Sequence, residues 1–222
     1  MQTDMVEAIQ RGDVPALEPL LLANPALATL RVDGQRTLLH VATDWPGHFP
    51  KVRQTIEVLV AHGAEVNAAF HGQHSETPLH WAASSGDVIA LDALLDRSAD
   101  INSPGSVIDG KTPLSDAVAF RQWHAARRLI ARGASPAIWQ SAALGMMDRL
   151  EPSFTADPKP SADEVTNAFW NACNGGQLET ARYLLGQGAA LNRVGHSGLT
   201  PLGAAARSGN EELVEWLRTQ GA

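Results

Sequence analysis

Histidine is the side chain with the widest chemical use in this sequence, which holds 8 of them in 222 residues. His71 and His74 stand three positions apart, a spacing found in zinc sites, but no second pair of cysteines or histidines with matching spacing lies nearby. We therefore expect both to be solvated loop side chains, and we predict no metal site and no cofactor.

Cys173 is the only cysteine, so no intramolecular disulfide can form. No histidine or basic residue close to it in the sequence would lower the pKa of its thiol, and we expect a small buried side chain. The sequence also contains no glycine-rich phosphate loop, no zinc-protease helix motif and no serine nucleophile elbow. It therefore predicts no catalytic residues and no enzyme activity.

The charge balance narrows the class of partner. With 17 Lys and Arg against 24 Asp and Glu, the net charge of −7 does not attract nucleic acid. The longest apolar runs, such as residues 20–23, are far shorter than the roughly 20 residues that cross a bilayer. The acidic start lacks the basic region of a signal peptide. We expect a cytoplasmic monomer with no nucleic-acid or membrane partner.

The elements that must position these side chains come from an internal repeat. One phrase, Thr-Pro-Leu-His-x-Ala, recurs with variations, and an apolar run with Gly-Ala or a near copy follows each time. It occupies residues 37–42, 77–82, 112–117 and 200–205. Residues 172–189 align without a gap on residues 82–99, and two further segments, 8–21 and 138–145, keep part of the frame. The spacing predicts a repeat over essentially the whole chain.

This phrase resembles the ankyrin repeat, whose period is about 33 residues, and the chain resembles a stand-alone, bacterial-type ankyrin-repeat protein. The resemblance implies an all-α solenoid of about seven stacked helix-turn-helix units with short finger turns. We expect these units to form a single domain over 1–222. Their expected boundaries are 1–31, 32–70, 71–104, 105–135, 136–160, 161–194 and 195–222.

The third unit shows how the sequence sets the helix ends. Thr77 can cap the first helix, Pro78 fits its first turn, and Gly86 ends it in a turn that needs no side chain. His40 and His80 hold the fourth place of the phrase. There the resemblance implies a hydrogen bond to the backbone of the next turn, and therefore a structural role.

Three segments depart from the pattern. A loop at 45–50, rich in proline and aromatic residues, either covers the end of its helix pair or forms a binding rim. A proline-rich connection at 155–160 replaces a finger, and we expect the helix that holds Phe169 and Trp170 to be longer than its counterparts. Positive charge gathers on one helix, as a solvated face or as a docking patch for an acidic partner, at Arg121, Arg127, Arg128 and Arg132.

The resemblance also implies that the first helices line a concave groove, which recognises partner proteins together with the finger turns. Alignment of the units predicts the partner-binding residues of this groove to be Trp45, Trp81, Ser84, Ser85, Asp116, Phe120, Asn171 and Asn174. Trp81 can serve equally as a binding anchor or as packing between units. We therefore predict a non-enzymatic protein-protein interaction scaffold with a protein partner of unknown identity.

The alternative function is a small-molecule binder or an atypical enzyme that uses a pocket in the groove. Asp116 would then act as acid or base, and Trp81 would form a wall of the pocket. An enclosed pocket with a raised Asp116 pKa favours this alternative, whereas a shallow open groove favours the scaffold.

Overall fold

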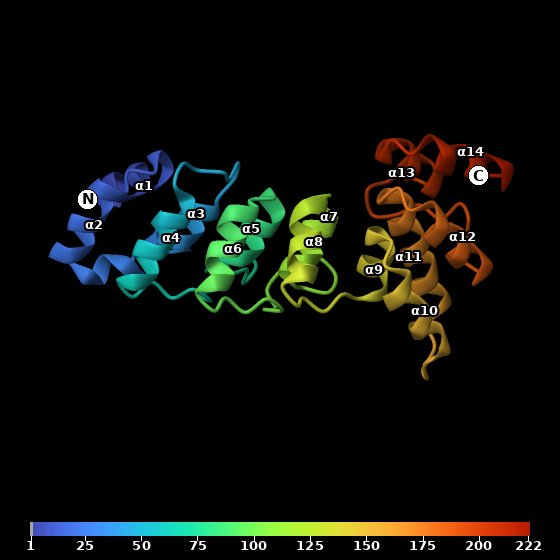
Figure 1. Ribbon diagram of the computed structural model, residues 1–222, viewed down its shortest axis with the longest axis horizontal. Helices are drawn as coiled ribbons and strands as arrows, with labels where there is room; N and C mark the ends of the chain where they lie inside the picture. The colour runs from blue at the N-terminus through green and yellow to red at the C-terminus, as the bar shows by residue number, and fades with distance from the viewer. Residues whose placement is uncertain (1) are drawn as a thin grey trace. The chain divides into compact units, whose positions relative to one another are not determined.

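The computed structural model describes residues 2–222, which fold mainly into α-helices (Figure 1). The helices gather into two compact units, of which unit 1 ends at Ser135 and unit 2 begins at Pro136. This point is also the expected boundary between the fourth and fifth repeats. The expectation of a single domain over 1–222 stays a prediction.

Unit 1 is a row of helix pairs in which each first helix packs against the first helix of the next pair. The first helices are α1 (Gln2–Arg11), α3 (Leu38–Thr43), α5 (Pro78–Ser85) and α7 (Pro113–Ala119). The second helices are α2 (Val14–Ala23), α4 (Val52–Ala61), α6 (Val88–Asp96) and α8 (Trp123–Ala131). We call the first helices the inner helices and the second ones the outer helices.

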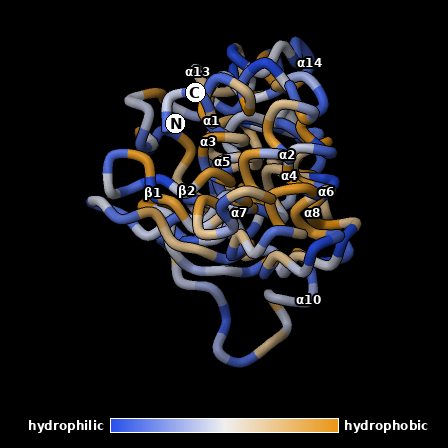
Figure 2. The backbone as a smooth tube through the Cα atoms, turned by 90° about the vertical axis from the view of Figure 1, so that its left-hand side faces the viewer, coloured by the Kyte–Doolittle hydropathy of each residue, from blue (hydrophilic) through white to orange (hydrophobic). Residues whose placement is uncertain are grey.

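Short segments join the pairs of unit 1. A 3₁₀ turn at Pro25–Thr29 leads into an antiparallel hairpin of β1 (Arg31–Val32) and β2 (Arg36–Thr37), with Arg31 opposite Thr37. Figure 2 shows hydrophobic residues along helices α3 to α6, whereas the connecting loops are largely hydrophilic. No pair buries both of its apolar faces alone, so stacking of successive pairs completes the core.

Unit 2 contains three further helix pairs among its described residues. They are α9 (Ile138–Leu144) with α10 (Met147–Thr155), α11 (Ala162–Asn174) with α12 (Leu178–Gly186), and α13 (Pro201–Ser208) with α14 (Glu211–Thr219). Helix α11 packs against both α9 and α13. Its 13 residues make it longer than its counterparts, which confirms the expectation for the helix that holds Phe169 and Trp170.

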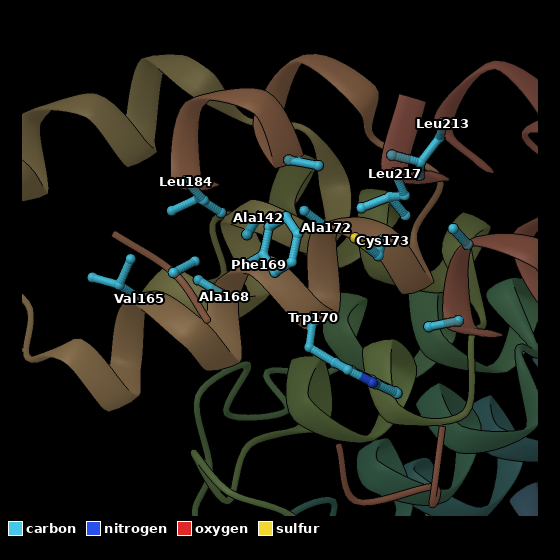
Figure 3. Close-up of a cluster of buried hydrophobic side chains, with 14 of the residues drawn as sticks. Ala142, Val165, Ala168, Phe169, Trp170, Ala172, Cys173, Leu184, Leu213 and Leu217 are labelled. Atoms are coloured by element: carbon cyan, nitrogen blue, oxygen red, sulfur yellow. The ribbon is translucent and has the colours of Figure 1, made fainter. Parts of the chain in front are cut away.

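The core of unit 2 forms around Phe169, which is fully buried (Figure 3). Leu184, Leu217 and several alanines belong to the same buried cluster, and the small alanines let the helices approach closely. Cys173 belongs to the same cluster as a free, buried thiol, and burial raises its pKa to about 12. This confirms its expected role as a small core side chain, because the reactive form of cysteine is the thiolate.

The helix starts follow the Thr-Pro signals of the sequence. Thr37, Thr112 and Thr200 each accept a hydrogen bond at the side chain from the backbone N–H three residues on, at 3.2–3.3 Å. Pro78, and likewise Pro113 and Pro201, begins its helix, where the missing N–H costs nothing. The expected all-α repeat architecture of seven helix pairs is confirmed over residues 2–222.

Two buried histidines connect neighbouring repeats. The Nδ1 atom of His40 accepts from the Thr37 N–H at 3.3 Å, and its Nε2 pairs with the Glu76 carbonyl oxygen at 3.1 Å in the next finger turn. His80 repeats this arrangement with Thr77 at 3.0 Å and with the Lys111 carbonyl oxygen at 3.2 Å. The expected structural role is confirmed. Burial lowers the pKa of each imidazole to about 4.

These shifts make the stability of unit 1 dependent on pH. Between about pH 6.5 and pH 4 the unfolded histidines bind protons that the folded ones reject, so their contribution to stability is lost as the pH falls through this range. His40→Gln removes one titrating group. Gln140 caps α9 from the equivalent place, accepting from the Ala137 N–H at 2.6 Å, so glutamine can preserve the cap.

We expect His40→Gln to cost about 1 kcal/mol at pH 7.5, because the bridge to Glu76 is weakened. Relative to wild type, the variant should recover stability as the pH falls from 6.5 to 4.5. Urea denaturation at several pH values measures both effects. A constant difference between the two proteins across this range would show that His40 is not held neutral in the fold.

Candidate functional site

A pocket of about 260 Å³ lies between the inner helices and finger turns of unit 1. We call it the groove pocket. Its lining residues are Thr43, Asp44, Trp45, His74, Glu76, Trp81, Ser84, Ser85, Val107, Ile108, Asp116 and Phe120. Six of the eight residues predicted from the sequence therefore meet at one place, although they come from three different repeats.

Large apolar side chains stand in solvent at the rim of the groove pocket. The exposed fractions are 76% for Trp45, 74% for Val107 and 59% for Phe120. Trp45 belongs to the inserted loop at 45–50, so its exposure favours a rim over a cover for the helix ends. The loop is fixed in place because the His48 N–H donates to Asp87 at 2.7 Å.

The same loop approaches α5 closely at Gly47. This glycine has a φ of 73°, and a Cβ there would lie 2.8 Å from the Ser85 hydroxyl oxygen. A side chain at this position would be strained by the backbone conformation and would require Ser85 to move.

Trp81 is half-buried and has both of the roles considered for it. Its indole N–H donates to Glu76 Oε2 at 3.0 Å, and its ring meets that of His40 edge-on with the centroids 4.8 Å apart. The remaining surface lines the groove pocket. Trp81 thus packs between neighbouring repeats of unit 1 and also forms a wall of the groove pocket.

Asp116 is the most unusual residue of the site, because its carboxyl group is almost fully buried and the residue is only 2% exposed. The Ser106 hydroxyl donates to Oδ1, whereas Oδ2 is buried without a hydrogen-bond partner. Burial raises the pKa of Asp116 to about 7, with a smaller contribution from the negative charge of Glu76. Such a shift marks a functional candidate because an unmet buried carboxylate is costly.

His74 differs from its expected place in solvent. It is half-buried, stacks on Phe70 with the ring centroids 4.6 Å apart, and lies 3.3 Å from Glu76 Oε2. It therefore belongs to the groove pocket, because the finger turn folds back onto α5, whereas His71 is exposed as expected. Within residues 2–222 no group of three or more His, Cys, Asp or Glu could hold a metal ion.

A second hollow, the finger cleft, opens between the finger turns at 70–75 and 104–111, with a volume of about 880 Å³. It shares His74 and Val107 with the groove pocket, so the two hollows adjoin. Finger turns and groove are thus joined in one surface of unit 1.

Sequence reasoning missed Ser106, Glu76, Val107 and His74 as members of the site. Ser106 holds Asp116, and Glu76 holds Trp81. All four come from finger turns, which carry no hydrophobic period to show which helix they will meet. For Glu76, the only available signal was a polar finger residue placed just before a helix that carries an aromatic residue, Trp81.

Asn171 and Asn174 lie in unit 2, on α11, and both side chains are buried. The Asn171 amide donates to the Asn167 carbonyl oxygen at 2.9 Å, and Arg207 donates to the Asn174 side-chain oxygen at 2.7 Å. Their membership of a partner-binding surface stays a prediction.

Two arginines of the cluster on and beside α8 form ion pairs within the fold. Arg128 and Arg132 both pair with Asp92 of α6, at 2.8 and 2.9 Å, and Arg132 also pairs with Asp96 at 2.9 Å. Arg128 remains partly exposed beside these ion pairs, so the solvated face and the docking patch for an acidic partner both stay predictions. No helix in the described part of the chain is long and apolar enough to cross a membrane.

Comparison with known proteins identifies the repeat. A family model described as ankyrin repeats in three copies matches residues 54–138, and a second, ankyrin repeats in many copies, matches residues 169–218. The human ASB11 ankyrin repeat domain has a similar structure, with a TM-score of 0.58, 21% identity and 96% coverage of both chains. The chain belongs to the ankyrin repeat family.

Relatives are also found by sequence. Human Rabankyrin-5 is 28% identical over 192 residues, which are 86% of this chain and 14% of that protein. The Drosophila melanogaster Neurogenic locus Notch protein is 36% identical over 109 residues, or 49% of this chain and 4% of that protein. The chain therefore spans only a small part of the length of these relatives.

The raised pKa of Asp116 opposes the effect of the histidines. The folded protein holds a proton on Asp116 between about pH 4 and pH 7 that the unfolded chain releases, so this group costs stability as the pH rises through that range. Asp116→Asn removes the titration and keeps an oxygen for Ser106.

We expect Asp116→Asn to gain stability relative to wild type as the pH rises from 4 to 8, by about 1 kcal/mol or more. Urea denaturation of both proteins at pH 4.5 and pH 8 measures the difference. Ser141→Ala, on helix α9 of unit 2, serves as a control that should show no such trend. Equal pH dependence of wild type and Asp116→Asn would mean that the carboxylate is paired or solvated.

Proposed function

We propose that this chain is a non-enzymatic interaction module that binds an extended segment of a partner protein across the groove pocket and finger cleft of unit 1. The observation that carries the proposal is the exposure of Trp45, Val107 and Phe120 around one pocket. Apolar surface gathered in this way is stabilised when a partner covers it.

The character of the surface supports a protein segment as the occupant. Aromatic anchors beside a few polar groups are typical of interface hot spots. The groove pocket is small, and the finger cleft continues from it, so a chain can place one side chain in the pocket and run on past Val107. Membership of the ankyrin family supports an interaction role, although a fold alone does not assign a partner.

The location and oligomeric state are part of the same proposal. A single cysteine that is buried and unpaired suits a reducing, cytoplasmic setting. We further propose that the chain acts as a monomer and does not use nucleic acid as a partner, since its net charge is −7.

A small-molecule binder or atypical enzyme is the second candidate, and one observation favours it. Asp116 lines the groove pocket, and its pKa of about 7 is the value expected of a general acid or base at neutral pH. However, the Ser106 hydroxyl that donates to Asp116 is itself buried, and its oxygen also accepts from the Ile108 N–H at 2.9 Å, which favours a structural role for this serine over that of a nucleophile. We therefore place this candidate second.

Selection of random displayed peptides against the full chain tests the proposal. We expect the selected peptides to bind wild type and to lose about thirtyfold in affinity for Trp45→Ala or Phe120→Ala, since an aromatic anchor contributes about 2 kcal/mol or more. Ile89→Ala is the matched control, because Ile89 is 57% exposed on the outer helix α6. Equal losses in all three variants, or no selected peptide, would contradict binding at the groove pocket.

A further inference from the structure

We propose that the groove pocket accepts the cationic end of a lysine or arginine side chain from the bound segment, with Asp116 as its counter-ion. This inference rests on the proposed function, and it specifies the chemistry of the partner. It follows from the charges that line the pocket, from the unmet oxygen of Asp116 and from the aromatic walls.

The lining of the groove pocket is acidic. It includes Asp44, Glu76 and Asp116, whereas no Lys or Arg is among the described lining residues. Two of these carboxylates already have partners. Asp44 pairs with Arg36 at 2.6 Å, and Glu76 accepts from the Trp81 indole at 3.0 Å and faces His74. Among the described residues Asp116 forms no ion pair, and the His74 partner of Glu76 is a cation only when its imidazole is protonated.

The unmet atom is Asp116 Oδ2. Asp116 is almost fully buried, with only 2% of its surface exposed. Its Oδ2 has no hydrogen-bond partner, because the Ser106 hydroxyl donates only to Oδ1. A buried carboxylate oxygen in this condition favours either a proton or a cation. The raised pKa of Asp116 shows the cost of leaving the charge alone. A bound cation would remove that cost and lower the pKa.

The walls of the pocket fit the rest of a basic side chain. Trp45, Trp81 and Phe120 present aromatic surface around the acidic lining. Lysine and arginine carry an apolar stem that can lie along such surface while the charged head reaches further. Aromatic faces also attract the cation itself. A neutral apolar side chain of the same length would leave Asp116 Oδ2 without a hydrogen-bond or ion-pair partner.

The first test uses small probes and the full wild-type chain. Nα-acetyl-lysine methylamide and Nα-acetyl-arginine methylamide are titrated while NMR follows the indole N–H signals of Trp45 and Trp81. The control is Nα-acetyl-norleucine methylamide, which has the stem without the charge. We expect saturable shifts with at least one cationic probe and none with norleucine. Equal shifts from all three probes would overturn the inference.

The second test is a double-mutant cycle with a peptide from the display selection. Replacing its basic residue by norleucine should weaken binding to wild type about tenfold or more, and should change binding to Asp116→Asn far less. Thermal melting of Asp116→Asn confirms that it folds. If it does not, the comparison of probes on wild type still decides the question.

The outcomes separate this inference from the proposed function. Selected peptides that bind at Trp45 and Phe120 but contain no required basic residue would overturn the cationic pocket and keep the interaction site. Coupling confined to the Asp116–cation pair would support both. Cationic probes that bind while no peptide does would support the pocket chemistry and overturn the proposed protein partner.

Discussion

The hydrogen bond from a buried histidine to the next finger turn is the contact on which the rest of unit 1 depends. His40 bonds to the Glu76 carbonyl and His80 to the Lys111 carbonyl, so the inner helices α3 and α5 each position the finger that follows. Those fingers supply Glu76 and Ser106, the two groups that hold Trp81 and Asp116 in place. The site is therefore built between repeats, and no single repeat contains it.

The buried histidines and the buried Asp116 of unit 1 have opposite effects on the stability of the fold near neutral pH. The histidines are buried in the neutral form and are satisfied at both ring nitrogens, so they stabilise the stack near neutral pH. Asp116, in the repeat that follows His80, is also buried, and its Oδ2 has no hydrogen-bond partner. A polar group of this kind lowers the stability of the free protein, and binding is the event that can recover the loss.

Much of the architecture could be predicted because local sequence signals mark where many of the helices begin and end. Pro78 and Gly86 mark the two ends of α5 by local chemistry alone, and six groove residues could be aligned from the repeat frame. The finger contacts could not be predicted in this way. Whether His74 turns inward, or Ser106 meets Asp116, depends on how loops without a hydrophobic period pack against a neighbouring repeat.

The central prediction for unit 1 is a buried carboxylate, Asp116, whose charge no ion pair within the described residues balances. NMR titration of the Asp116 side-chain carboxyl carbon in the full chain tests it directly, with Asp116→Asn used to assign the signal. We expect a midpoint near pH 7 in the free protein and a lower midpoint once a basic peptide is bound. A midpoint close to pH 4 in the free protein, unchanged by the peptide, would contradict the account.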